Sequence, residues 1–253
     1  MPVTTSPQPP ARGRKTRGKL TPALRFLVPI VRNLSRGVFK ERFEGLDNVP
    51  AEGPAILVLN HISVLDPLAT ASFVYEAGRI PSFMIKDSVF KVPVLGKLML
   101  GARQIPVSRG TSASGGSLDA AVRMLRDGGV VAVYPEGTVT RDRDFWPMRA
   151  KTGVGRIALA VPDVPVVPIA QWGAHRALNY HTKKLDLLPR KETWISALPP
   201  LDTSKYAGRP ANEAARQITD DVMRQIMARV AEMRAETAPA EFYNPSVPRR
   251  EAP

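Results

Sequence analysis

Short runs of consecutive apolar residues alternate along the chain with segments in which apolar residues recur at helical spacing. Unbroken runs such as 54–59 and 130–133 are typical of strands that are covered on both faces. Segments such as 117–127 and 212–236 have the spacing of amphipathic helices. Strands that alternate with helices predict an α/β protein with a mixed, largely parallel sheet layered by helices.

The same pattern gives bounds for each expected element. Strands are predicted over residues 42–46, 54–59, 82–85, 105–107, 130–134, 164–170 and 192–197. Helices are predicted over residues 20–39, 67–75, 88–103, 117–127, 152–160 and 212–236. We therefore expect one domain over residues 41–237, preceded by an amphipathic helix and followed by a flexible, Pro-rich tail over 238–253.

The N-terminal forty residues carry nine Lys or Arg and no Asp or Glu. Residues 1–19 have the composition of a disordered basic arm. In residues 20–40 the apolar positions share one helical face, and Arg25, Arg32 and Arg36 lie on the opposite face. Two interpretations fit this segment: a helix packed on the domain with a solvated basic face, or an amphipathic helix lying in an anionic membrane surface. We favour the membrane-interacting helix, because the arm that precedes it is also basic.

Composition narrows the chemistry. The 253-residue chain has no cysteine, which excludes thiol nucleophiles and cysteine-based zinc sites. Because it has only three histidines, we do not expect a metal site with several histidine ligands. No apolar run is long enough for a transmembrane helix. The net charge of +13 suits either nucleic acid or an anionic membrane.

The first candidate for chemistry follows the apolar run 54–59, in the segment Asn60-His61-Ile62-Ser63-Val64-Leu65-Asp66-Pro67. A turn into a helix after Asn60 would bring Asp66 back to His61. The carboxylate could then hold the proton on one ring nitrogen and leave the other nitrogen as a base. The alternative is a capping Asn, a surface His and a helix-side Asp that never meet. Ser63 as a nucleophile is a weaker hypothesis, because it lacks the Gly-x-Ser-x-Gly elbow.

A second segment, Tyr134-Pro135-Glu136-Gly137-Thr138, follows the apolar run 130–133. Together, Asn-His-x-Ser-x-x-Asp and Pro-Glu-Gly-Thr resemble two motifs of the glycerolipid acyltransferase family, specifically the 1-acyl-glycerol-3-phosphate acyltransferases. Two lesser blocks of the family have counterparts in residues 104–109 and 164–170, and the resemblance covers about residues 43–200. The family's fold is the layered α/β arrangement predicted above.

The resemblance implies an enzyme that moves a fatty acyl group from acyl-CoA or an acyl carrier protein to the sn-2 hydroxyl of lysophosphatidic acid, giving phosphatidic acid. It implies no cofactor and no metal. His61 would be the base and Asp66 its partner, and backbone N–H groups after Asn60 are the natural candidates for binding the oxyanion. Arg109 would bind the acceptor phosphate. Glu136 would contact a glycerol hydroxyl or order its loop, and Gly137 and Thr138 could present backbone N–H groups to the phosphate.

This chain departs from the family where an arginine usually follows the Gly-Thr pair, because Val139-Thr140-Arg141 stands there. Arg141, Arg143 or Lys151 could supply the charge instead. The departure leaves open another lysophospholipid or a glycolipid as acceptor. The loop residues Trp146-Pro147-Met148 could touch lipid or cap the core, and His175 and His181 are expected to be structural or surface residues.

Function classes outside the family also remain. A basic nucleic-acid-binding protein would explain the charge but not His61, Asp66 or Glu136, so no nucleic acid is expected as a partner. A hydrolase could use the same His and Asp. With lipid substrates and a basic N-terminus, the enzyme is expected to lie peripherally on the cytoplasmic face of the cell membrane.

Overall fold

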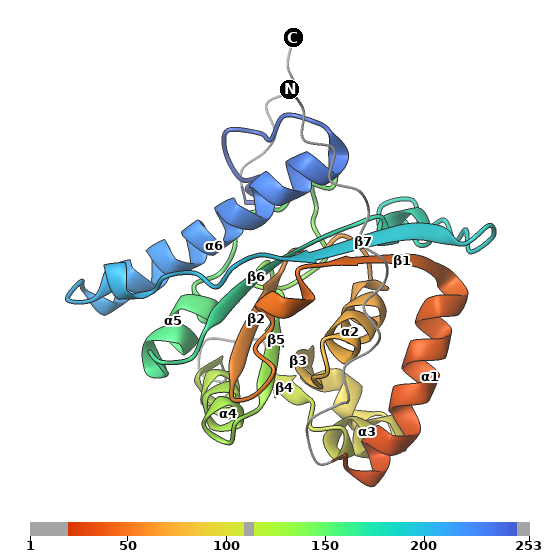
Figure 1. Ribbon diagram of the computed structural model, residues 1–253, viewed down its shortest axis with the longest axis horizontal. Coiled ribbons are helices and arrows are strands. Elements are labelled where there is room, and N and C mark those ends of the chain that lie inside the picture. The colour runs from red at the N-terminus through yellow and green to blue at the C-terminus, as the bar shows by residue number, and fades with distance from the viewer. Residues whose placement is uncertain (1–19, 109–113, 247–253) are drawn as a thin grey trace.

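The computed structural model describes residues 20–108 and 114–246, which form a seven-stranded sheet (Figure 1). In chain order its strands are Phe39–Glu44 (β1), Ala55–Leu59 (β2), Pro81–Lys86 (β3), Ile105–Val107 (β4), Val130–Val133 (β5), Val166–Trp172 (β6) and Lys191–Ala197 (β7). Their order across the sheet is β1-β7-β6-β2-β5-β3-β4. All neighbours are parallel except β6 and β7. The predicted mixed, largely parallel sheet is therefore confirmed.

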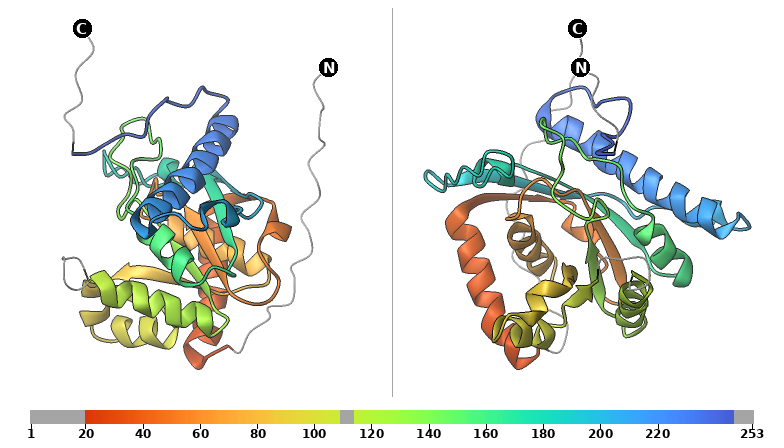
Figure 2. Two further views of the ribbon diagram at one scale, coloured as in Figure 1. Left: turned by 90° about the vertical axis from the view of Figure 1, so that its left-hand side faces the viewer. Right: turned by 180° about the vertical axis from the view of Figure 1, so that it is seen from behind.

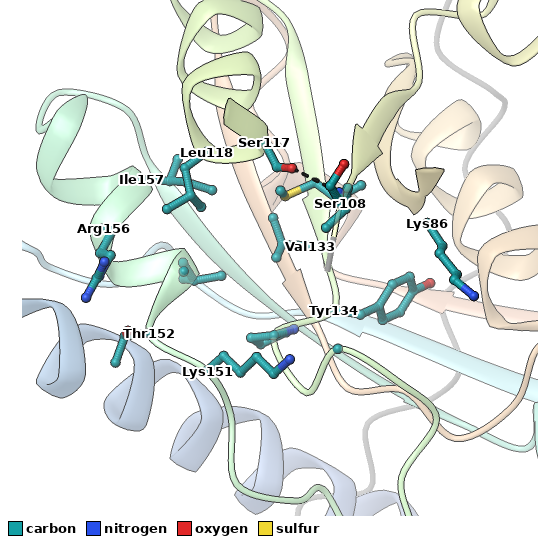
Figure 3. Close-up of a pocket in the computed structure, with 16 residues that line it drawn as sticks. Lys86, Ser108, Ser117, Leu118, Val133, Tyr134, Lys151, Thr152, Arg156 and Ile157 are labelled. Carbon is teal, nitrogen blue, oxygen red and sulfur yellow. Dashed lines mark hydrogen bonds between the residues drawn. The ribbon is translucent and has the colours of Figure 1, made fainter. Parts of the chain in front are cut away.

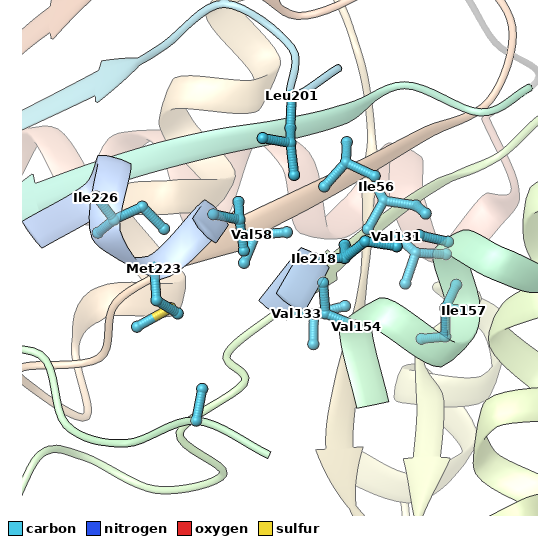
Figure 4. Packing of buried hydrophobic residues seen from close by; sticks show 14 of the residues in the cluster. Ile56, Val58, Val131, Val133, Val154, Ile157, Leu201, Ile218, Met223 and Ile226 are labelled. Atoms are coloured by element: carbon cyan, nitrogen blue, oxygen red, sulfur yellow. The ribbon is translucent and has the colours of Figure 1, made fainter. Parts of the chain in front are cut away.

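Helices cover both faces of this sheet (Figure 2). They are Pro22–Val38 (α1), Asp66–Glu76 (α2), Leu95–Gly101 (α3), Ser114–Arg126 (α4), Gly153–Ala160 (α5) and Ala211–Arg234 (α6). Alternate residues of β2 serve two cores, because successive side chains of a strand point to opposite faces. Leu57 and Leu59 pack with α2, whereas Ile56 and Val58 pack with α4, α5 and α6 (Figure 4).

The long helix α6 crosses the sheet face and lies against α5 and β6. Gly155 permits this close approach, since a Cβ atom there would lie 2.0 Å from the carbonyl oxygen of Ala215. Gly155 N also donates a hydrogen bond of 3.2 Å to the Thr219 hydroxyl. The C-terminal helix is thus fixed against the domain that carries the sequence motifs.

The predicted helix over residues 88–103 is interrupted. A 3₁₀ helix spans Asp87–Lys91, and α3 begins only at Leu95. Pro93 lies between them. Val92, which precedes it, is extended at φ −73° and ψ 122°, as residues before proline prefer. Val94 then takes a positive φ of 65°, so a continuous helix was the wrong prediction for this segment.

The N-terminal helix begins after Thr21, whose hydroxyl accepts from Leu24 N at 3.2 Å. At Phe39 the chain passes directly into β1, so this edge strand begins earlier than predicted. Phe39 is 1% exposed and pairs with Lys191 of β7, so it belongs to the sheet. The basic arm predicted over residues 1–19 lies outside the described residues.

The C-terminal segment that follows α6 contacts the domain, although its composition is Pro-rich. Arg149 N donates a 2.8 Å hydrogen bond to the Tyr243 carbonyl, and Met148 and Tyr243 form an isolated parallel bridge. Phe242 packs against the core cluster that includes residues of α6. Phe242 and Tyr243 therefore contact the domain, and the flexibility of the tail stays a prediction. Residues 247–253 lie outside the described part of the chain.

Candidate active site

His61 and Asp66 meet at the carboxyl end of β2. The Nδ1 atom of His61 lies 2.8 Å from Asp66 Oδ2, and the His61 side chain is 15% exposed whereas that of Asp66 is fully buried. The same carboxylate oxygen accepts from the backbone N–H groups of Ile62 at 2.6 Å and Ser63 at 2.8 Å. An acceptor at Nδ1 assigns the ring proton to that nitrogen and leaves Nε2 as the free base. The expected pairing of His61 with Asp66 is therefore present.

The backbone hydrogen bonds change one sequence expectation. Backbone N–H groups after Asn60 were expected as candidates for binding the oxyanion, and those of Ile62 and Ser63 are among them. In the structure both donate to Asp66, so their donors are already used. The Ser63 hydroxyl is also engaged, donating to the Leu178 carbonyl at 2.9 Å from a fully buried position. This placement gives no support to Ser63 as the nucleophile.

The Pro-Glu-Gly-Thr loop holds the His61 backbone from both sides. Glu136 Oε1 accepts from His61 N at 2.8 Å, and Thr140 N donates to the His61 carbonyl at 2.7 Å. The second carboxylate oxygen of Glu136 accepts from Met148 N at 3.0 Å. Both oxygens of Glu136 are thus used to order the loop and to place the peptide that carries the imidazole.

Burial raises the pKa of Glu136 to about 8, although hydrogen bonds from Met148 and His61 act in the opposite direction. The ordinary pKa of this carboxyl is 4.5. Between these values the folded state binds more protons than the unfolded chain. Stability must therefore fall as pH rises from about 4.5 to about 8, and this contribution is constant above that range.

We predict that Glu136→Gln removes this pH dependence. The wild-type free energy of unfolding should lose up to about 1.4 kcal/mol per pH unit from this group, and the variant should not show that slope. The variant should be less stable overall, because its amide nitrogen cannot accept the second backbone N–H. Denaturant unfolding of both proteins between pH 5 and pH 8 measures the difference. Parallel curves would show that Glu136 does not titrate in this range.

A polar network behind the histidine places an aromatic ring against it. The rings of Tyr134 and His61 stack with centroids 4.4 Å apart and planes inclined by 26°. The Tyr134 hydroxyl lies 3.0 Å from the Thr70 hydroxyl, which donates to Gln171 Oε1 at 3.1 Å. Gln171 in turn exchanges hydrogen bonds with Asn60, including Gln171 N to Asn60 Oδ1 at 2.9 Å.

Neither Tyr134 nor Gln171 was identified from the sequence. Their signal was positional: Tyr134 directly precedes Pro-Glu-Gly-Thr, and Gln171 directly follows the fourth motif block. Tyr134 follows β5 and Gln171 is the last but one residue of β6, the two strands that neighbour β2, so both lie near the edge where polar side chains of parallel strands gather. The network joins β2, β5, β6 and α2 around the imidazole.

Tyr134 also lines a pocket of about 600 Å³ (Figure 3). Lys86, at the end of β3, and Lys151 place amino groups on either side of the Tyr134 ring in this view. The inner wall is mainly apolar and comprises Met84, Val107, Leu118, Val133, Val154 and Ile157. We call this the lysine pocket. Lys86 was missed because a single lysine at a strand end carries no motif of its own.

A second pocket of about 610 Å³ lies along the Pro-Glu-Gly-Thr loop. Its cationic lining consists of Arg141, Arg149, Lys151 and Arg216, and we call it the arginine pocket. Gly137 and Lys151 line both pockets, and a Cβ atom at Gly137 would lie 3.4 Å from Lys151 Nζ. Gly137 has a positive φ of 76°, so a side chain there would also strain the backbone.

The predicted substrate-binding residues are thus distributed unevenly. Glu136, Gly137, Thr138, Arg141 and Lys151 all line the arginine pocket, and only Gly137 and Lys151 also reach the lysine pocket. Arg109 lies outside the described residues; its neighbour Ser108 lines the lysine pocket. His61 is among neither set of lining residues, but it contacts one residue from each, namely Tyr134 through its ring and Glu136 through its N–H.

The loop after the third motif turns its apolar residues inward. Trp146 is 7% exposed and Met148 is 2% exposed, which is the core-capping alternative rather than a lipid contact. The Arg234 guanidinium lies 3.8 Å from the Trp146 ring centroid and donates to the Asp144 carbonyl at 2.7 Å. Burial, together with nearby Arg176 and Arg234, lowers the pKa of His175 to about 3, so this histidine is neutral and structural.

Two further features concern metals and membranes. Over residues 20–108 and 114–246, no three His, Asp or Glu side chains gather as metal ligands would. In the same described ranges, no helix combines the length and apolarity needed to span a bilayer.

Comparison with known proteins places these features in a family. The sequence model of the family described as Acyltransferase matches residues 40–172. A chloroplastic 1-acyl-sn-glycerol-3-phosphate acyltransferase of Brassica napus is 32% identical over 142 residues, covering 55% of this chain and 39% of that protein. The 1-acyl-sn-glycerol-3-phosphate acyltransferase of Escherichia coli strain K12 is 28% identical over 188 residues, covering 72% of each. The chain thus spans well under half of the Brassica protein.

The fold has a counterpart among solved structures. The crystal structure of the 1-acyl-sn-glycerophosphate (LPA) acyltransferase of Thermotoga maritima superposes with a TM-score of 0.60 at 19% sequence identity. The match covers 85% of this chain and 83% of that one. The segment matched by the family's sequence model is more than half of the chain and contains His61, Asp66 and Glu136. The chain belongs to the acyltransferase family.

Proposed function

We propose that this protein transfers a fatty acyl group from a thioester to the sn-2 hydroxyl of lysophosphatidic acid. The observation that carries the proposal is the His61–Asp66 pair, whose imidazole contacts the Tyr134 ring on the wall of the lysine pocket. That pocket combines an apolar wall with two amino groups. A lysophospholipid combines an acyl chain with a phosphate, so the two match in chemistry.

In the proposed mechanism His61 Nε2 takes the proton of the acceptor hydroxyl as its oxygen attacks the thioester carbonyl. The tetrahedral intermediate then collapses, the carbon–sulfur bond breaks, and the imidazolium returns the proton to the leaving thiolate. Asp66 stabilises the imidazolium through Nδ1. No acyl-enzyme is required, because the thioester is already activated. The step needs no cofactor.

The acceptor phosphate is assigned to the lysine pocket. Only a few covalent bonds separate the sn-2 hydroxyl from the phosphate of lysophosphatidic acid, so both must lie near the His61 ring. Lys86 and Lys151 line the pocket whose wall includes Tyr134, the residue stacked on that ring. Arg109 lies outside the described residues, and its sequence motif supports the same role.

We predict that Lys86→Ala raises the KM for lysophosphatidic acid by about tenfold or more, because a charge-assisted contact to the phosphate is lost. The KM for the acyl donor should change much less. Steady-state kinetics with each substrate varied in turn will measure both constants. Lys91→Ala is the matched control, since Lys91 is exposed and lines neither pocket. An unchanged acceptor KM in the Lys86 variant would remove this lysine from the site.

A related acceptor is the second candidate, and one observation favours it. Val139 occupies the position at which the 1-acyl-glycerol-3-phosphate acyltransferases usually carry an arginine. Its side chain is buried, with 3% exposed. A buried valine cannot contact a headgroup phosphate. Another lysophospholipid or a glycolipid would therefore suit this chain if the loss of that arginine reflects a different headgroup.

Product analysis tests the function directly. The full chain is incubated with a panel of lysolipids and a mixed pool of acyl-CoA or acyl carrier protein thioesters, and the products are identified by mass spectrometry. Phosphatidic acid is the expected product. Acylation of another lysolipid alone would select the second candidate. Release of free fatty acid without an acylated lipid would identify a hydrolase and overturn both proposals.

We further propose that the enzyme binds peripherally to an anionic membrane, at the cytoplasmic face, through α1. Phe26, Ile30 and Leu34 recur at intervals of four residues along this helix and are 61%, 44% and 54% exposed. Residues Leu24 and Val38 pack inward instead. We call Phe26, Ile30 and Leu34 the apolar stripe. Their exposure supports insertion of this side of α1 into the acyl boundary of a bilayer.

Two of the three arginines on α1, Arg32 and Arg36, form ion pairs with the domain, whereas the sequence predicted a solvated basic face. Arg36 pairs with Glu76 at 2.8 Å, and Arg32 pairs with the same carboxylate. These ion pairs fix α1 against the end of α2, so the orientation of the apolar stripe is set by the domain. Helix α3 lies against α1 (Figure 1). The helix and the residue before it add exposed apolar side chains: Val94 at 77%, Leu95 at 40% and Leu100 at 57%.

A further inference from the structure

The arginine pocket has four cationic side chains in its lining, although the acceptor phosphate has been assigned to the lysine pocket. Arg141, Arg149, Lys151 and Arg216 line it. Among the described residues, Arg141, Arg149 and Lys151 have no acidic partner, and Arg216 has Asp220 at 3.6 Å. Glu136 is the acidic residue of the lining, and both its oxygens accept backbone N–H groups. Such a concentration of cations points to a ligand with several negative charges.

Three separate parts of the chain build this pocket, and contacts between them fix its shape. Arg216 of α6 donates to the Ala150 carbonyl at 3.0 Å. The backbone of Arg149 is joined to Tyr243 by a 2.8 Å hydrogen bond. Asn244, Pro245 and Ser246 then form a wall. Neither α6 nor this C-terminal segment belongs to the part matched by the family's sequence model, residues 40–172.

The position of the pocket separates it from the acceptor site. Its contact with His61 runs through Glu136 to the backbone N–H, whereas the lysine pocket contacts the imidazole through Tyr134. A phosphate only a few bonds from the reacting hydroxyl must lie on the imidazole side. A phosphate at the end of a long arm can lie farther away. The shared lining at Gly137 and Lys151 shows where such an arm could pass between the pockets.

We propose that the arginine pocket binds the phosphate groups of coenzyme A in the acyl donor. This inference rests on the proposed function and names the donor that the function leaves open. Coenzyme A carries three phosphate groups at the end of a long pantetheine arm, with the thioester at the other end. Arg149 and Arg216 bind phosphate oxygens from the loop and from α6, with guanidinium geometry suited to such contacts. Arg141 and Lys151 complete the positive lining.

The test is binding of coenzyme A itself to the full chain, measured by titration calorimetry. Arg149→Ala combined with Arg216→Ala should raise its Kd by about tenfold or more, since each charged contact is worth that order of affinity. Arg149→Ala alone should give a smaller rise in the same direction and leaves the contact of Arg216 with Ala150 intact. Arg126→Ala, an exposed arginine at the end of α4 that lines neither pocket, should leave the Kd unchanged.

Steady-state kinetics separate this proposal from the proposed function. The double variant should show a raised KM for acyl-CoA and a nearly unchanged KM for lysophosphatidic acid. An unchanged Kd for coenzyme A in the folded double variant would overturn the pocket assignment, as would a rise confined to the acceptor KM. Absence of transfer to lysophosphatidic acid by the wild type would instead refute the proposed function, whatever the affinity for coenzyme A.

Discussion

Replacing His61 with alanine is expected to reduce acyl transfer by about 10²–10⁴-fold, the usual contribution of a positioned general base. The reason is geometric: Asp66 holds the proton on Nδ1, and Tyr134 stacks on the ring, so Nε2 is the nitrogen available to the acceptor hydroxyl. The rate is measured as product formed from acyl-CoA and lysophosphatidic acid at saturating substrate. Thermal unfolding of the variant checks that the loss is chemical.

Ser63→Ala is the matched control for His61→Ala. The Ser63 hydroxyl donates to the Leu178 carbonyl, and its backbone N–H, which donates to Asp66, is kept in the variant. This variant should therefore retain most of the activity. A folded His61→Ala enzyme with a rate near that of the wild type would refute the mechanism. An inactive but folded Ser63→Ala enzyme would reopen the nucleophile hypothesis.

Replacing the three residues of the apolar stripe, Phe26, Ile30 and Leu34, with glutamine is expected to remove most of the binding to anionic liposomes. Fully burying one such side chain is worth about 1.5–3 kcal/mol, and these three are roughly half exposed in the protein. Their loss should cost a few kcal/mol of membrane affinity. Sedimentation with liposomes measures the effect. Activity on bilayer-embedded acceptors should fall more than activity on monomeric short-chain acceptors.

Point substitutions are preferable here to deletion of residues 1–40. Leu24, Val38 and Phe39 are buried, and α1 is joined to α2 through Glu76, so deletion would open the core. The control replaces Leu159, Leu185 and Leu188, three exposed leucines elsewhere on the surface, with glutamine. If the stripe variant sediments with liposomes as fully as this control, α1 is ordinary surface and the proposed membrane contact is wrong.

The local pattern of the sequence determined the framework of the site. Strands β2 and β5 are unbroken apolar runs, and such runs predict buried neighbours in a sheet. His61 is the second residue after β2 and Glu136 is the third after β5, so both were expected at the carboxyl edge. The pairing of His61 with Asp66 was also predictable, because it depends on one turn and the start of one helix. These features involve interactions between residues close in sequence.

Contacts between distant segments were decided only by the tertiary structure. The Glu136 carboxylate accepts from the backbone of His61, 75 positions away, and no side-chain pattern reports a backbone donor. The same holds for Arg149 and Tyr243, whose hydrogen bond docks a segment that composition alone predicts to be flexible. The stacking of Tyr134 on His61 likewise needs two strands to be neighbours.

The burial of side chains on α1 also could not be predicted from the sequence. The sequence specified an apolar face and an arginine face, which is what helical periodicity contains. Whether the apolar face is covered depends on what packs against it. Here Leu24 and Val38 are buried and Glu76 of α2 engages Arg36, whereas Phe26 and Leu34 stay exposed. Periodicity is a property of one helix, whereas coverage is a property of its neighbours, so only the folded arrangement could decide it.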